Sequence, residues 1–198
     1  MKKGERTKEL ILDGAVRLAS ELGLEGLSLG KLAEELELSK SGLFAHFGSK
    51  EDLQVQTLAR AAERFAEVVV LPALGAPAGE PRLRTLFQLW LDWPRKVKQP
   101  GGCIFMAAAA ELDDRPGPAR DKLVALQKEW QVTLARVVKS GQDAGAFRRD
   151  ADPAQVAFEI LGIGLGTHFF ARLLREPRAA DRARDAFERL VQHLVVRS

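Results

Sequence analysis

Three serines near the N-terminus each stand where a helix would begin. Ser28, Ser39 and Ser49 precede segments whose apolar residues recur at three- and four-residue steps, and serine is among the preferred N-cap residues. After Ser49 and Lys50 come Glu51 and Asp52, two acidic side chains that suit the first turn of a helix. The segment Leu27–Leu53 therefore predicts two short helices joined by a tight turn and the start of a third, which is a helix-turn-helix pattern.

The helical spacing of apolar residues continues through the rest of the chain, and no alternating strand pattern interrupts it. We expect an all-α fold of about nine helices in two domains, a helix-turn-helix domain over residues 1–49 and a second helical domain over residues 50–198. Gly23 should end the first helix and Pro72–Pro81 should form a linker. The remaining helices are expected over Thr7–Leu22, Lys50–Leu71, Arg82–Val97, Gly101–Glu111, Pro118–Ala144, Pro153–Arg175 and Arg178–Val196.

Composition places the chain among ordinary globular proteins. It has 198 residues, of which 46% are hydrophobic and 29% charged, enough for a buried core. No unbroken apolar run reaches the roughly 18 residues of a membrane span, and the N-terminus lacks the apolar stretch of a signal peptide. Cys103 is the only cysteine, so no internal disulfide can form, and we expect a cytoplasmic location.

The local distribution of charge, and not the net charge, bears on DNA binding. The net charge of +3 is small, and residues 1–52 hold eight basic against ten acidic side chains. Basic residues nevertheless gather at the N-terminus, and the segment from Leu38 to Lys50 contains no acid. The N-terminal basic residues are Lys2, Lys3, Arg6 and Lys8. A basic edge on an otherwise acidic domain is compatible with DNA binding without establishing it.

The helix-turn-helix residues resemble the DNA-binding domain of the tetracycline-repressor (TetR) family of bacterial transcriptional regulators. The resemblance is carried by Ala33, Leu38-Ser39, Leu43-Phe44, His46-Phe47 and Ser49-Lys50-Glu51-Asp52-Leu53. Two positions depart from the family pattern. Glu37 stands where glycine is usual, so a positive φ there would cost about 1 kcal/mol. Phe44 stands where tyrosine is usual, and its ring has no hydroxyl to offer a phosphate.

A second phrase resembles a signature in the C-terminal domains of one TetR subgroup. It begins at Gly101-Gly102-Cys103, includes Glu111, and ends at Asp113-Asp114-Arg115-Pro116-Gly117-Pro118. The two resemblances together imply a two-domain regulator that binds double-stranded operator DNA.

The outer face of the second short helix is the expected DNA contact. Small residues there allow close approach to base edges in the major groove, whereas lysine and the serines at helix starts suit bases or phosphates. A plain surface helix is the competing interpretation, because periodicity alone produces such faces often. The expected DNA-binding residues are Ser28, Ser39, Lys40, Ser41, Gly42, Phe44, Ala45, His46 and Lys50.

The resemblance implies that the second domain holds a small apolar effector between its helices. Most of its aromatic residues belong to the core on helical spacing alone, so only a subset would line a cavity. The candidates are Trp90, Phe105, Glu111, Trp130, Phe158 and His168.

The last two expected helices are apolar enough to need a partner. The resemblance implies that this helix pair forms the interface of a homodimer. The expected interface residues are Phe158, Leu161, Gly162, Leu165, Gly166, Phe169, Phe187, Leu190 and Leu194. Gly162 and Gly166 share a helix face, where they would allow close approach of a neighbouring helix.

Other chemistries have little support in the sequence. The glycines of Leu161–Gly166 lie in a helical pattern with no preceding strand, which argues against a nucleotide site. No histidine has partners at metal spacing, so neither a metal nor another cofactor is expected. Cys103 follows two glycines at a helix start, where a thiol could sense oxidants, although a buried packing role fits it better.

The sequence thus predicts a homodimeric repressor that a small effector releases from a palindromic operator. A helical small-molecule binder that has lost operator binding is the alternative, favoured by Glu37, Phe44 and the acidic balance of the first domain. An enzyme is the third and weakest hypothesis, because no catalytic motif is present.

Overall fold

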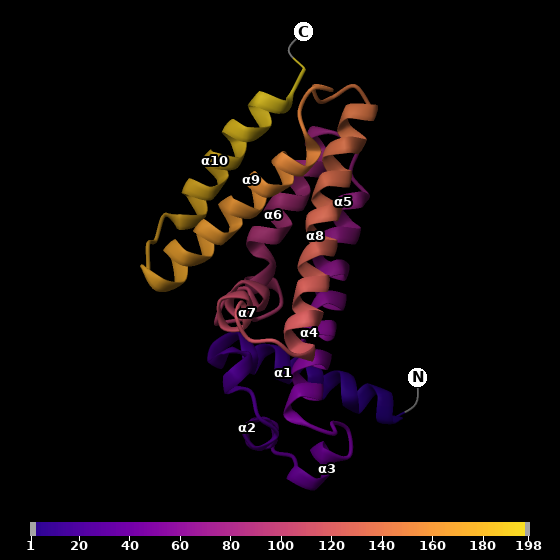
Figure 1. Ribbon diagram of the computed structural model, residues 1–198, viewed down its shortest axis with the longest axis vertical. Coiled ribbons are helices and arrows are strands. Elements are labelled where there is room, and N and C mark those ends of the chain that lie inside the picture. Colours follow the sequence, from indigo (N-terminus) through magenta and orange to yellow (C-terminus); the bar gives the residue numbers. More distant parts are fainter. Residues whose placement is uncertain (1–2, 197–198) are drawn as a thin grey trace. The chain divides into compact units, whose positions relative to one another are not determined.

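The computed structural model describes residues 3–196, with side chains from residue 6 onward. Within that range the chain is helical throughout, apart from turns and one isolated bridge between Phe147 and Val195. When the two π-helical segments are counted with the helices they extend, the described residues form nine helices (Figure 1), which confirms the predicted all-α fold. Lys2 and the side chain of Lys3 lie outside the described residues.

The chain divides into two compact units. The first unit comprises the chain up to Phe65 together with Pro94–Leu126, and the second comprises Ala66–Trp93 with the chain from Gln127 onward. The predicted functional boundary between Ser49 and Lys50 rests on a different criterion and stays a prediction. The elements are α1 (Lys3–Gly26), α2 (Leu29–Glu35), α3 (Lys40–Phe44), α4 (Lys50–Phe65), η1 (Ala66–Val70), α5 (Leu71–Leu74), α6 (Glu80–Lys96), α7 (Ile104–Leu112), α8 (Pro118–Asp143), α9 (Pro153–His168), η2 (Phe169–Leu173) and α10 (Ala179–Leu194).

The first unit is built on the packing of α1 against α4 and α7. Apolar side chains of α1, α2 and α4 form its core together with Leu43 and Phe47, both fully buried. The Arg60 guanidinium on α4 bonds both carboxylate oxygens of Asp13 on α1, at 2.7 and 3.2 Å. A two-pronged bond of this kind fixes direction as well as distance, so it holds α4 against α1.

The second unit is built on aromatic contacts. Phe87 on α6 stacks on Phe187 of α10, with ring centroids 3.9 Å apart and planes 3° from parallel. The Arg84 side chain, also on α6, is bonded to Glu188 of α10. Figure 1 shows α9 and α10 running side by side. Asp152 caps α9 by accepting a hydrogen bond from Ala154 N at 2.9 Å, with Pro153 in the first turn.

The predicted end of the helix from Lys50 and the predicted linker after it are wrong. The helix from Lys50 does not stop near Leu71 but continues through η1 and α5 to Leu74, so the connection to α6 is shorter than the predicted linker. Pro72 lies in the first turn of α5, directly after a π-helical turn. A proline interrupts a helix mainly through its missing N–H, and that loss matters least at the first turn.

The helix formed by α9 and η2 is strongly apolar. Pro153–Leu173, which joins α9 and η2, is long and apolar enough to cross a bilayer by length and composition, and only 22% of its apolar 18-residue window is buried inside the chain. Polar residues interrupt this stretch, so the absence of an unbroken apolar run of about 18 residues did not reveal it. A helix with this composition and so little burial has an uncovered apolar face.

Candidate nucleic-acid interface

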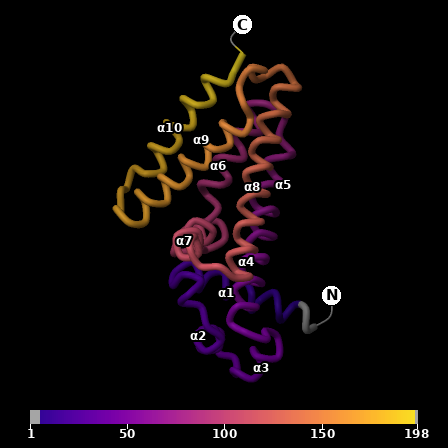
Figure 2. The backbone as a smooth tube through the Cα atoms, in the orientation of Figure 1, coloured from indigo at the N-terminus to yellow at the C-terminus, as the bar shows by residue number. Residues whose placement is uncertain are grey.

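Figure 2 shows the backbone turning between α2 and α3, and two backbone hydrogen bonds close the end of α2 there. Leu38 N donates to Ala33 O at 2.9 Å and Glu37 N donates to Glu34 O at 3.3 Å, which are the two bonds of a Schellman motif. A Schellman motif places the residue after the C-cap in the left-handed conformation. Glu37 is that residue, and its φ is 54°. The positive φ expected from the resemblance is therefore present, although glutamate occupies the position.

Both helices of the motif have serine caps, as predicted. Ser28 Oγ accepts from Lys31 N at 3.2 Å and Ser39 Oγ accepts from Gly42 N at 3.1 Å. Ser49 caps α4 in the same way, accepting from Asp52 N at 3.0 Å. Each cap satisfies a backbone donor that would otherwise have no partner at a helix start, so local chemistry alone defines where these three helices begin.

The third helix turns one side to the core and the other to solvent. Leu43 and Phe47 are fully buried, and they anchor α3 and the turn after it. Most of the predicted DNA-binding residues on this helix lie on the open side, with Phe44 58% exposed and His46 half-buried beside the Phe47 ring. The exposed residues are Ser39, Lys40, Ser41, Gly42, Phe44 and Ala45.

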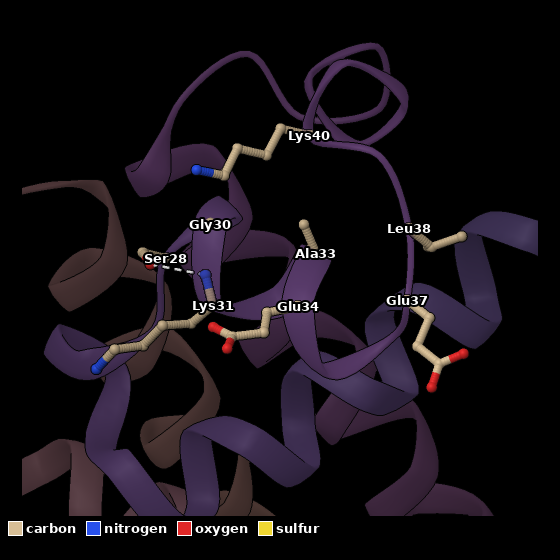
Figure 3. Close-up of a pocket in the computed structure, with 8 residues that line it drawn as sticks. All are labelled: Ser28, Gly30, Lys31, Ala33, Glu34, Glu37, Leu38 and Lys40. Atoms are coloured by element: carbon tan, nitrogen blue, oxygen red, sulfur yellow. Dashed lines mark hydrogen bonds between the residues drawn. The ribbon is translucent and has the colours of Figure 1, made fainter.

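Lys40 is directed back toward α2. A Cβ built on Gly30 would lie 3.7 Å from Lys40 Cε and 3.9 Å from its Nζ, so the end of this side chain lies over the first turn of α2. A shallow hollow forms there, with Lys40 above Gly30 and the Ser28 cap (Figure 3). The hollow is lined by Ser28, Gly30, Lys31, Ala33, Glu34, Glu37, Leu38 and Lys40.

The Lys50 ammonium group, by contrast, is hydrogen-bonded within the first unit. Its Nζ donates to Glu25 O at 2.7 Å and to the Glu25 carboxylate at 3.3 Å. Partial burial raises the pKa of the Glu25 carboxyl, but the hydrogen bond and charge of Lys50, together with Gln54 and Arg115, outweigh burial and lower that pKa. Lys50 therefore connects the start of α4 to the end of α1, a role that the sequence analysis did not foresee.

Glu111 also contacts the end of α1. Its Oε2 accepts a hydrogen bond from Glu25 N at 2.9 Å, and a Cβ built on Gly23 would lie 1.9 Å from its Oε1. Gly23 breaks the regular helix here, with φ of 77°, and no larger residue would leave room for the carboxylate. Phe105, another predicted effector residue, packs edge-on against Phe65 in the same unit, with ring centroids 6.0 Å apart.

The other predicted effector residues lie in the second unit. The Trp90 and Trp130 rings meet edge to face with centroids 5.5 Å apart, so these two are brought together. His168 is half-buried, and burial, helped by the charge of Arg172, lowers its pKa. Phe158 is 65% exposed and so faces solvent in the single chain.

Sequence reasoning missed Gly164, which makes room for one of these tryptophans. A Cβ on Gly164 would lie 2.2 Å from the Trp90 ring, so only glycine lets α9 pack against α6 at this point. The signal was present in the three alternating glycines, but it was interpreted only as close approach at Gly162 and Gly166.

The predicted dimer residues fall into two groups. Those of α9 and η2 form an exposed stripe, in which Phe158, Leu165 and Phe169 are 65%, 52% and 49% exposed. Beyond its own helical turn, a Cβ on Gly162 or Gly166 would meet no atom within 4 Å. On α10, Phe187 and Leu194 are buried within the chain and Leu190 is half-buried, so these three predicted residues are not part of the exposed stripe.

Comparison with known proteins gives two family matches that together cover most of the chain. Residues 11–57 match the family described as "Bacterial regulatory proteins, tetR family", and residues 79–187 match "Tetracyclin repressor-like, C-terminal domain". The N-terminal match contains the whole α2–turn–α3 segment, and the C-terminal match alone spans more than half of the sequence.

Curated relatives and solved structures agree with these matches. The HTH-type transcriptional repressor AcnR of Corynebacterium glutamicum is 39% identical over 67 residues, which span 34% of this chain and only 36% of AcnR. The repressor NicS of Pseudomonas putida is 27% identical over 151 residues, 75% of this chain and 69% of NicS. The crystal structure of a TetR-family transcriptional regulator from Cytophaga hutchinsonii shares the fold, with a TM-score of 0.86 at 21% identity, over 100% of this chain and 99% of that one.

Proposed function

The chain belongs to the TetR family of bacterial regulatory proteins, and from this premise we propose that it is a homodimeric, DNA-binding transcriptional repressor. We propose further that a small apolar effector releases it from a palindromic operator, and that it acts in the cytoplasm, where operator DNA lies. The observation that carries the proposal is the exposed side of α3, held outward by the buried Leu43 and Phe47.

DNA binding is supported by the chemistry of the helix starts. Exposed Ser41 and Gly42 lie on α3, where small side chains allow a helix to enter the major groove. Lys40 and Lys31 line the hollow at the start of α2, and lysine ammonium groups there would neutralise phosphates. Phosphate contacts would position the motif, whereas α3 would read the bases.

A homodimer is supported by the uncovered stripe on α9. Phe158, Leu165 and Phe169 are large apolar side chains left in water by the single chain, and a second copy of the same stripe would cover them. In such a dimer two α3 helices would read half-sites about one helical turn, roughly 34–36 Å, apart.

An effector would act by shifting a population of conformations. It must bind the released form of the dimer more tightly than the DNA-bound form, and a hundredfold loss of DNA affinity requires a preference of about 3 kcal/mol. In the second unit we propose Trp90, Trp130 and His168 as effector contacts. Phe105 and Glu111, which were also predicted, have partners within the first unit.

The Gly-Gly-Cys phrase, proposed to mark a TetR subgroup, has a structural interpretation. A Cβ on Gly101 would lie 1.3 Å from Ser20 O, Glu111 bonds Glu25 N, and Arg115 lies 3.7 Å from the Glu25 carboxylate. Both ends of the phrase thus contact α1. We propose that these residues mark a TetR subgroup because they form this contact with α1.

The proposal is tested by mobility shift on duplex DNA taken from beside the gene. The wild-type protein should form a sequence-specific complex, and Lys40→Ala should weaken it and lower the salt dependence of log K by about one phosphate contact. Lys128→Ala is the matched control, because Lys128 lies on α8, outside the motif. A protein that forms no specific complex at low salt, yet gains thermal stability with a small apolar ligand, would instead be the binder without operator function.

A further inference from the structure

The largest group that α3 presents to solvent is apolar. Phe44 is 58% exposed, and Ser41, one helical turn earlier, shares its side of the helix. Ala45 follows Phe44 and is also exposed. Phe44 cannot turn inward, since the interior beneath α3 is already filled by Leu43 and Phe47, both fully buried.

The polar groups of the motif are occupied or directed elsewhere. Ser39 Oγ accepts from Gly42 N at 3.1 Å and lies 3.3 Å from Ser41 Oγ. The end of the Lys40 side chain lies over Gly30 of α2, where a phosphate contact suits it better than a base. Residues 28–50 contain no Asn, Gln or Arg, so lysine is the only side chain of this segment that belongs to the types making two-pronged hydrogen bonds to adenine or guanine.

From this inventory we infer that Phe44, with Ala45 beside it, reads the C5 methyl group of thymine in the major groove. Among the four bases only thymine presents a methyl group there, and it is the one base feature that an exposed phenyl ring can recognise without a hydrogen bond. Phe44 has no hydroxyl to give to a phosphate, so its ring is available as a base reader. This inference rests on the proposed operator binding and assigns the chemistry by which the operator is distinguished.

The experiment separates methyl readout from DNA binding in general. The full chain selects duplexes from a random pool, and fluorescence anisotropy gives the Kd of the selected duplex. Each thymine is then replaced by uracil, which keeps the base pair and removes only the methyl group. At one thymine or more in each half-site, the substitution should weaken wild-type binding about fourfold for each methyl group that the ring covers.

Two variants test whether Phe44 is the residue that contacts the thymine methyl group. Phe44→Ala should bind the thymine duplex more weakly and should no longer distinguish it from the uracil duplex. Lys40→Ala should bind both more weakly but keep the full thymine preference. Phe44 is exposed, so its removal should leave the melting temperature unchanged, which serves as the check on folding.

Three results would overturn the inference. Equal binding of the thymine and uracil duplexes by the wild-type protein would exclude methyl readout while leaving the repressor proposal intact. An undiminished thymine preference in Phe44→Ala would assign the readout to another residue. Selection that yields no specific duplex would remove operator binding itself, and the inference with it.

Discussion

Glu37 adopts a backbone conformation that suits glycine. Its φ of 54° closes the C-cap of α2, and a side chain in this region costs of order 1 kcal/mol or more. Glu37→Gly should therefore raise the free energy of unfolding by about 0.5–1 kcal/mol, part of the gain being offset by the greater freedom of glycine in the unfolded chain. Urea denaturation measures the change.

Glu37→Ala is the control for that prediction. It removes the carboxylate but keeps a Cβ in the same strained conformation, so it should bring no gain of this kind. Equal stabilisation by alanine and glycine would mean that the carboxylate, not the backbone, is the source of the cost.

His168 makes stability depend on pH in a defined direction. Burial, helped by the Arg172 charge, lowers its pKa in the folded chain, so the unfolded chain binds a proton at a pH where the folded chain does not. Stability should therefore fall as the pH drops below the ordinary histidine pKa of about 6.5. Melting temperatures at about pH 7.5 and about pH 5.5, on either side of that value, should differ less in His168→Asn than in the wild-type protein, whereas an unchanged difference would exclude His168 as the source.

At the scale of elements, hydrogen bonds from α4 and α7 hold the end of α1. Glu111 on α7 accepts from the backbone of Glu25, and Lys50 on α4 donates to the same residue. Glu111→Ala leaves the Glu25 N–H without its carboxylate partner and should lower the free energy of unfolding by about 1 kcal/mol, as measured in urea.

Two variants calibrate this loss. Glu111→Gln keeps an oxygen acceptor and should recover most of it. Asp114→Ala removes a nearby exposed acid of the same phrase and should have little effect. If Asp114→Ala were as damaging as Glu111→Ala, net charge and not the bond to Glu25 would explain both.

Contacts between residues close in the sequence could be predicted from it, whereas contacts between distant residues could not. The serine caps at Ser28, Ser39 and Ser49 depend on neighbours three residues away, and all three are present. Pro72 was misjudged because the π-helical turn before it could not be foreseen. The Glu111 bond to Glu25 spans 86 positions of sequence, so no periodicity or spacing could indicate it.

The same distinction applies to the candidate site. The exposed side of α3 follows from helical spacing, because Leu43 and Phe47 lie four residues apart and both turn inward. The direction of Lys40 toward Gly30 and the engagement of Lys50 by Glu25 are tertiary facts. They change the proposed role of each lysine without changing the motif that contains them.

For the whole molecule, the decisive prediction concerns the stripe on α9. Leu165→Glu places a charge at its centre and should convert the proposed dimer to monomers, because two buried carboxylates would face each other without partners. Sedimentation velocity gives the mass. Val132→Glu is the matched control, since Val132 is an exposed apolar residue of α8 outside the stripe, and it should leave the dimer intact. A Leu165→Glu protein that remains dimeric would place the interface elsewhere.

The bare side of α9 also has a consequence for abundance. If the proposed dimer covers this face of α9, the survival of each chain depends on the number of copies made. At low concentration, newly synthesised chains would be monomeric, and Phe158 and its neighbours would be exposed to proteases and chaperones. At high concentration, dimerisation would bury these side chains. Regulation by such a protein would begin at a threshold of expression, and its thermal midpoint would climb as the protein is concentrated.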